Sequence, residues 1–392
     1  MENYKYYIVE YFGNKISFSY RILNDEIDSY LDYFIVGILN NFIHQPYYEL
    51  IKLYGGDLKK EIHQYFDRKI GNTDGQDYLF NNIGIIWNLF EINGRTRESQ
   101  YLWEDILNIV LDWERKTGER IHKGSIYYFW SKTAISQGEF EKGFFLIHSA
   151  YEEDVITQNN KLPNTPAFKT VSLRYTDSEN LLFRLVEKWA KYLENFINEY
   201  NKKYNKSFSL SDFQSKFLDK PPSRDILFSF SYSLAKNYSV EQFPDEIKNG
   251  NFLSYYEMKS LSEIILVIDN LIYVSIINPG RHDYRFINLG SKLLFTAKIN
   301  QNESLGRDHL NDVNQAKDND FEKCLNELLD QVFVFSSDNF NCQGLESDVS
   351  IAYLFRNYTA HNIETFPVIS RRFQEIRQSI YNVLFLAIET FY

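Results

Sequence analysis

The sequence predicts an all-α protein that begins with one small β-hairpin. Leu, Ile, Tyr and Phe recur at three- and four-residue spacing through almost the whole chain, which is the period of amphipathic helices. Only eight prolines interrupt 392 residues, so long helices can form. Only the first two dozen residues alternate apolar and polar side chains, which is the period of a strand.

The predicted hairpin lies in "KYYIVEYFGNKISFSYRIL", residues 5–23. Its second half alternates Ile and aromatic residues with polar ones, as expected of a half-buried strand. Gly13 and Asn14 stand between the halves and provide the turn. Residues 1–160 are predicted to form this hairpin and a helical region.

Within that region, "YYFWSKTAISQGEFEKGFFLIHSAYEED", residues 127–154, predicts two helices joined at Gly138. The stretch resembles the second half of a tetratricopeptide (TPR) repeat, with Gly143 where the repeat has Ala. Four tryptophans fall on successive predicted helices, and we interpret them as core between helices rather than as a ligand platform. They are Trp87, Trp103, Trp113 and Trp130.

A boundary follows at "TQNNKLPNTPAF", residues 157–168, which is rich in Asn, Thr and Pro and has no periodicity. Residues 170–392 are predicted to form a second helical region, with its core at about 252–392. A capping box of Thr176 and Glu179 predicts the start of a long helix. Further helices are expected at about 255–277, 284–299, 320–334, 345–361 and 367–391.

Composition limits the classes of function. The net charge of −11 argues against a broad nucleic-acid footprint, because such binding uses clustered Lys and Arg. Two cysteines cannot build a disulfide framework, and no apolar run is long enough to span a bilayer. We therefore expect a cytoplasmic protein with no membrane partner, and no ligand pattern indicates a metal or another cofactor.

The candidate functional motif is in "AYLFRNYTAHNIETFP", residues 352–367, where four residues separate Arg356 from His361. Spacing alone is weak support, because Arg115 and His122 in "RKTGERIH" also satisfy a loose Arg-to-His rule. We expect those two on an exposed connection and treat their pairing as accidental. The C-terminal motif differs because Asn357 directly follows Arg356, at the end of an amphipathic helix.

These residue types suit RNA cleavage without metal. The ribose 2′-hydroxyl must attack its own phosphate, the 5′-oxygen must gain a proton, and charge on phosphorus must be neutralised. Arg356 offers a permanent charge and paired donors to phosphate oxygens. His361 titrates closest to neutral pH, and Asn357 would orient the phosphate or the imidazole.

The motif at Arg356, Asn357 and His361 resembles that of the HEPN family, the "higher eukaryotes and prokaryotes nucleotide-binding" domains. The resemblance implies a bundle of four or five helices and a metal-independent endoribonuclease. It also implies a homodimer in which two motifs face each other, in prokaryotic antiviral defence such as abortive-infection, toxin or CRISPR-associated systems. The N-terminal helical region would then sense, restrain or recruit, with a protein or nucleotide as its regulator.

Several residues near the motif are predicted to contact RNA. Arg371, Arg372 and Arg377 are the densest Arg cluster in the chain and could clamp the RNA backbone. Alternatively, they form a solvated face paired with Glu364 and Glu375. Tyr358 would stack on a base or belong to a core or interface. Thr359 completes the set.

A non-catalytic protein remains the alternative class. In that case Arg356 would pair with a carboxylate such as Asp348 or Glu364, and His361 would end a helix, where a cation is favoured. The helical bundle would then serve RNA binding or protein interaction without cleavage.

Overall fold

The computed structural model describes residues 4–11, 14–21, 27–41, 45–175, 181–242, 251–276, 303–336, 339–359 and 366–392. Helices make up most of these residues, which confirms the predicted all-α class. The chain divides into two compact units, unit 1 at Met1–Lys169 and unit 2 at Thr170–Tyr392.

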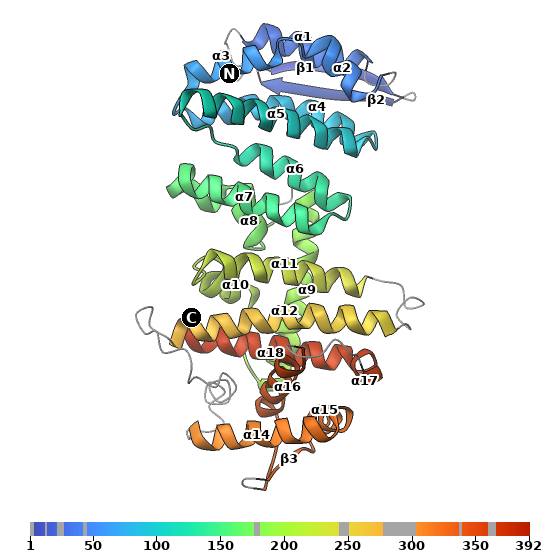
Figure 1. Cartoon of the computed structure of the whole chain (residues 1–392), viewed down its shortest axis with the longest axis vertical. Coiled ribbons are helices and arrows are strands. Elements are labelled where there is room, and N and C mark those ends of the chain that lie inside the picture. Colours follow the sequence, from blue (N-terminus) through green and yellow to red (C-terminus); the bar gives the residue numbers. More distant parts are fainter. Residues whose placement is uncertain are drawn as a thin grey trace. The chain divides into compact units, whose positions relative to one another are not determined.

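Unit 1 contains two strands followed by helices (Figure 1). They are β1 (Tyr4–Tyr11), β2 (Asn14–Arg21), α1 (Ile27–Asn41), α2 (Tyr47–Tyr54), α3 (Leu58–Lys69), α4 (Thr73–Ile92), α5 (Thr96–Thr117), α6 (Gly124–Ser136), α7 (Phe140–Gln158), the 3₁₀ helix η1 (Asn159–Asn164) and α8 (Pro166–Val171), within which the division falls.

The described residues of unit 2 are helical apart from one short strand pair. Its elements are α9 (Leu181–Tyr204), α10 (Leu210–Phe213), the π-helix η2 (Gln214–Leu218), α11 (Arg224–Glu241), α12 (Asn251–Ile276), α14 (Glu303–Asn319), α15 (Phe321–Leu329), β3 (Val334–Phe335), β4 (Phe340–Asn341), α16 (Leu345–Thr359), α17 (Pro367–Arg371) and α18 (Phe373–Phe391).

The two N-terminal strands pair antiparallel, with register from Tyr4 opposite Arg21 to Tyr11 opposite Asn14. β2 lies against α4 (Figure 1). On β1, Tyr6 and Ile8 are both exposed, because residues two apart in a strand lie on the same face of the sheet. Gly13 of the predicted turn lies outside the described residues.

The core of unit 1 is strongly aromatic. Trp87, Trp103 and Trp113 are buried, and Trp130 packs half-buried against them. Trp103 stacks on Phe129 with ring centroids 5.5 Å apart. The prediction that the tryptophans form core between helices is therefore confirmed.

Helices α6 and α7 pack closely along their length, as two helices in the stretch 127–154 were expected to do. Gly138 has φ of 80° in the connection, a backbone conformation that glycine adopts without strain. A Cβ on Gly143 would lie 2.3 Å from Cγ1 of Ile135. Glycine is thus required at position 143 for these two helices to approach.

The C-terminal helix α18 is the central helix of unit 2. All residues from Ser379 to Ile388 are buried, which fits a helix that is apolar on all sides. It contacts α9, α12 and α16, and Figure 1 draws α12 and α18 side by side. None of the helices within the described ranges has the length and apolar character needed to cross a bilayer.

Two predicted helix boundaries differ from the structure. The helix expected at 320–334 ends at Leu329, because Gln331 takes a left-handed φ of 58°; β3 and β4 follow. The helix expected at 367–391 is divided at Arg372 into α17 and α18. Helix α14 was not predicted, and the helix expected at 284–299 lies outside the described residues.

Candidate functional site

Arg356 stands in the last turn of α16, where the helix dipole stabilises a positive charge. Its Nε donates to Oδ2 of Asp269 on α12 over 2.8 Å, and its Nη1 donates to Oδ1 of Asn357 over 3.1 Å. The Arg356 side chain is 44% exposed, whereas that of Asp269 is 14% exposed. The guanidinium therefore joins a half-buried carboxylate on one side to solvent on the other.

Asn357 links the motif to α14. Its Nδ2 donates to Oδ1 of Asn314 over 3.2 Å, and Nδ2 of Asn314 donates to the Tyr353 hydroxyl over 2.7 Å. This chain of amides and hydroxyl holds the Asn357 carboxamide, so that its oxygen accepts from Arg356. Three helices, α12, α14 and α16, thus fix the first two residues of the motif.

His361 lies outside the described residues, in the stretch 360–365 between α16 and α17. The same holds for Glu364, one of the two carboxylates considered as a partner for Arg356. The other, Asp348, is buried and accepts from Lys203 over 3.0 Å and from Asn382 over 2.7 Å. The carboxylate that Arg356 contacts is instead Asp269, which the sequence analysis did not single out.

Tyr358 is buried, and Thr359 is half-buried with its hydroxyl bonded to its own helix. The Tyr358 ring is 7% exposed and packs on Phe321 and Phe366, with ring centroids 4.3 and 5.7 Å away. The Thr359 hydroxyl donates to the carbonyl of Phe355 over 2.8 Å. The expectation that Tyr358 stacks on a base is wrong for this conformation, because aromatic neighbours bury the ring; the alternative core role fits.

The three arginines of the predicted clamp differ in their surroundings. Arg371 is 69% exposed, while Arg372 is 19% exposed and pairs with Asp330 and Glu375 at 2.8 and 2.6 Å. This pairing fits the alternative interpretation of a charge-paired face. Both arginines lie toward α15, whereas Arg356 contacts α12 and α14.

Arg377 requires a correction. Its side chain is 1% exposed and its Nη1 donates to the Tyr192 hydroxyl over 2.7 Å. The guanidinium lies over the rings of Tyr192, Phe196 and Phe373, and pairs with Glu241 at 3.1 Å. A clamp on RNA that includes Arg377 is wrong for this structure, because the residue lies on the buried face of α18.

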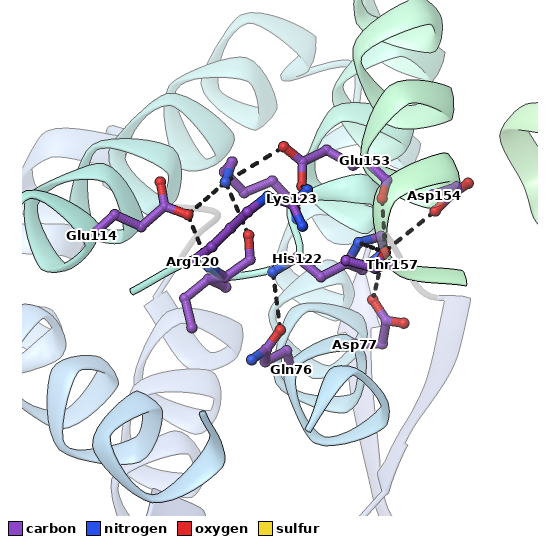
Figure 2. Close-up of polar contacts among 10 residues, drawn as sticks. Gln76, Asp77, Glu114, Arg120, His122, Lys123, Glu153, Asp154 and Thr157 are labelled. Carbon is purple, nitrogen blue, oxygen red and sulfur yellow. Dashed lines mark hydrogen bonds and ion pairs between the residues drawn. The ribbon is translucent and has the colours of Figure 1, made fainter. Parts of the chain in front are cut away.

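A second polar cluster lies in unit 1 and involves a histidine that the sequence analysis set aside (Figure 2). The segment 120–123, which connects α5 to α6, inserts between acidic residues of three helices. Those acidic residues are Asp77 of α4, Glu114 of α5, and Glu153 and Asp154 of α7.

His122 is only 3% exposed. Its Nδ1 is 2.8 Å from the Thr157 hydroxyl, and its Nε2 is 3.3 Å from Oδ1 of Asp154 and 3.7 Å from Oδ1 of Asp77. Nε2 of His122 therefore lies beside two carboxylates, one from α4 and one from α7. The interpretation that His122 sits on an exposed connection is wrong, although Arg115 is 76% exposed.

The neighbouring Lys123 is also buried. Its Nζ donates to Glu114 over 2.6 Å and to the Ile121 carbonyl over 2.9 Å, and it lies 3.4 Å from Glu153. Two of the three ammonium hydrogens thus have acceptors, and Glu153 adds a second nearby carboxylate. The only sequence signal for this cluster was the pair of glycines, Gly118 and Gly124, that bracket the segment.

Thiol and metal chemistry find no support among the described residues. Burial raises the pKa of Cys324 to about 12, and burial likewise raises the pKa of Cys342, so both thiols stay protonated and unreactive. Across the described ranges no group of three or more His, Cys, Asp or Glu side chains is arranged to hold a metal ion.

The fold and site thus define a mainly helical protein of two units, with an anchored arginine at one helix end. No protein-family model, curated protein or solved structure matches the chain. Its function is therefore argued from the chemistry of these residues.

Proposed function

We propose that unit 2 is a metal-independent endoribonuclease of the HEPN type, with Arg356, Asn357 and His361 as its catalytic residues. One observation carries the proposal: the Arg356 guanidinium is held by Asp269 and Asn357 while half of the side chain stays exposed. Among the described residues its Nη2 has no partner. An anchored cation with a free donor suits a phosphate oxygen.

The proposed reaction is attack of the ribose 2′-hydroxyl on the adjacent phosphorus. The new oxygen–phosphorus bond forms as the bond to the 5′-oxygen breaks, so the products carry a 2′,3′-cyclic phosphate and a 5′-hydroxyl. Arg356 neutralises the charge that develops on the phosphate. His361 transfers a proton, because imidazole titrates near neutral pH.

One Arg and one His are few groups for three tasks, so we propose that two copies pool their motifs in a homodimer through the C-terminal bundle. Unit 1 would then regulate the site by binding a protein or a nucleotide. We propose a cytoplasmic role in prokaryotic antiviral defence. The support is the resemblance of the motif, together with two buried cysteines that are both free thiols.

Cleavage of single-stranded RNA in EDTA tests the proposal. Wild type should produce 2′,3′-cyclic phosphate ends, and His361→Ala should lower the rate by about 10²- to 10⁴-fold. Arg356→Lys is preferable to Arg356→Ala, because Lys keeps a charge beside Asp269 but lacks the planar fork of donors. Arg115→Ala and His148→Ala, at exposed or half-exposed positions of unit 1, are matched controls.

The competing proposal is a non-catalytic helical protein that binds RNA or another protein. Burial of Tyr358 and Arg377 favours it, because two of the expected RNA contacts are unavailable. Binding of RNA with no cleavage in any of these proteins would support this alternative. Equal cleavage by wild type, His361→Ala and Arg356→Lys would likewise overturn the proposed catalytic site. A strict monomer in sedimentation would exclude the composite site.

A further inference from the structure

We propose that Asp269 is a positioning residue that orients Arg356 toward the scissile phosphate; this rests on the proposed ribonuclease function. Asp269 is 87 positions away from Arg356 in the sequence and lies on α12, outside the motif. It would not touch the RNA. Its effect would pass through the guanidinium alone.

The two contacts of the Arg356 guanidinium fix its orientation. A guanidinium is planar, so contacts at two of its nitrogens fix the direction of the third. Asp269 accepts from Nε at 2.8 Å and Asn357 accepts from Nη1 at 3.1 Å. These two contacts use one hydrogen each of Nε and Nη1, so both hydrogens of Nη2 and the second hydrogen of Nη1 can reach phosphate oxygens.

The two side chains of the pair also differ in their exposure to solvent. The Asp269 side chain is 14% exposed and the Arg356 side chain is 44% exposed, so the carboxylate is held by the protein while the cation reaches solvent. Burial raises the pKa of Asp269, and the hydrogen bond and charge of Arg356 act in the opposite direction. Arg356 is the only partner found for this carboxylate within the described residues.

A second ion pair on α12 shows what a purely structural pair looks like. Glu263 pairs with Lys236 of α11 at 2.9 Å, and the two side chains are 23% and 22% exposed. Both partners are equally covered, and neither contacts the motif. The Asp269 and Arg356 pair is asymmetric instead, because the carboxylate is 14% exposed and the cation is 44% exposed.

The test compares Asp269→Asn, Asp269→Leu and Glu263→Gln in the full-length protein. Asn keeps an oxygen that can accept from Nε of Arg356, so Asp269→Asn should keep kcat within about threefold of wild type. Leu offers no acceptor, and the released guanidinium should lower kcat by about 10- to 100-fold with little change in KM. Glu263→Gln breaks a pair on the same helix and should leave kcat unchanged.

Urea unfolding of each variant separates positioning from stability. Equal kcat in wild type and Asp269→Leu would overturn the proposal, as would losses of kcat that simply follow the losses of stability in all three variants. A large fall in kcat with Asp269→Leu, and its rescue by Asn, would support it.

A second readout does not depend on cleavage. The Nε–H of Arg356, assigned in ¹⁵N spectra with Arg356→Lys, should exchange slowly with solvent in wild type and rapidly in Asp269→Leu. If wild type cleaves no RNA, the proposed function fails and this exchange still decides whether Asp269 orients Arg356. Unchanged exchange in Asp269→Leu would overturn the positioning role.

Discussion

Nε2 of His122 lies 3.3 Å from Oδ1 of Asp154, inside unit 1, and the two side chains are 3% and 8% exposed. The contact joins the connection between α5 and α6 to helix α7 (Figure 2). Buried polar groups of this kind stabilise a fold only while each has its partner. The contact therefore makes His122 a structural residue whose loss can be measured.

We expect His122→Leu to lower the free energy of unfolding of unit 1 by about 2–3 kcal/mol, because buried Asp154 loses the imidazole beside it and the Thr157 hydroxyl loses its contact with Nδ1. Urea unfolding followed by tryptophan fluorescence measures this, since four of the five tryptophans lie in unit 1. His148→Leu, at a half-exposed site on α7, should stay within about 0.5 kcal/mol of wild type. Equal effects of the two substitutions would contradict the expectation.

A second prediction concerns Gly124, which lies beside the same cluster. A Cβ there would be 2.7 Å from both Oδ1 of Asp154 and Nε2 of His122. Gly124→Ala should therefore cost about 1–3 kcal/mol through overpacking. Gly84 on α4 is the matched control, because its added Cβ would meet Phe129 at an ordinary 3.6 Å. Gly84→Ala should be neutral or stabilising by up to about 1 kcal/mol. A lower melting temperature for Gly84→Ala than for Gly124→Ala would refute this account.

A third prediction concerns pH. Burial lowers the pKa of Lys132 to about 8, although Glu91 opposes this. Unfolded lysine titrates near about 10.4, so between about pH 8 and 10.4 the unfolded chain binds a proton that the folded chain has released. The contribution of Lys132 to the free energy of unfolding should therefore rise with pH across that window, by at most about 1.4 kcal/mol per pH unit.

The comparison of wild type with Lys132→Met isolates this effect, because other titrating groups cancel in the difference. The difference in unfolding free energy should increase in favour of wild type from pH 8 to pH 10. The rings of Trp87 and Tyr128 lie 5.3 and 5.0 Å from Nζ and favour the charged ammonium, which would reduce the slope. A flat difference would show that Lys132 keeps its ordinary pKa.

A fourth prediction concerns Arg377. Arg377→Ala removes both the stacking on Phe196 and the partner of Glu241, and should destabilise unit 2 by about 3 kcal/mol. Arg377→Met keeps much of the side-chain volume and should destabilise unit 2 less than Arg377→Ala does. Hydrogen exchange of α9 and α18 peptides measures both, with Arg371→Ala as the exposed control. Hydrogen exchange in Arg377→Ala that is no faster than in wild type would contradict the structural role of Arg377.

Several features were predictable because they depend on local pattern. Periodicity predicted the all-α class and the start of α16 at Leu345, since amphipathic spacing is a property of neighbouring residues. The tryptophan core followed from the size of the indole rings.

Arg377 was misjudged because proximity in sequence was read as proximity on a surface. Arg372 stands at the N-cap of α18, whereas Arg377 lies inside the helix on the same side as Phe373 and Ile380, which are both buried. Arg372 remains on the outer side and pairs with Glu375. Counting arginines cannot distinguish these two sides without knowing what packs against the helix.

The sequence by itself determined the helical class, the position of the motif at the end of one helix, and the chemistry that Arg356 and Asn357 can offer. Only the tertiary structure decided which carboxylate Arg356 contacts and that His122 is buried. Asp269 is 87 residues from Arg356, and Asp77 and Asp154 likewise come from helices other than the connection that carries His122. The physical reason is that such pairings arise when helices pack, and packing is a property of the whole fold rather than of any local stretch.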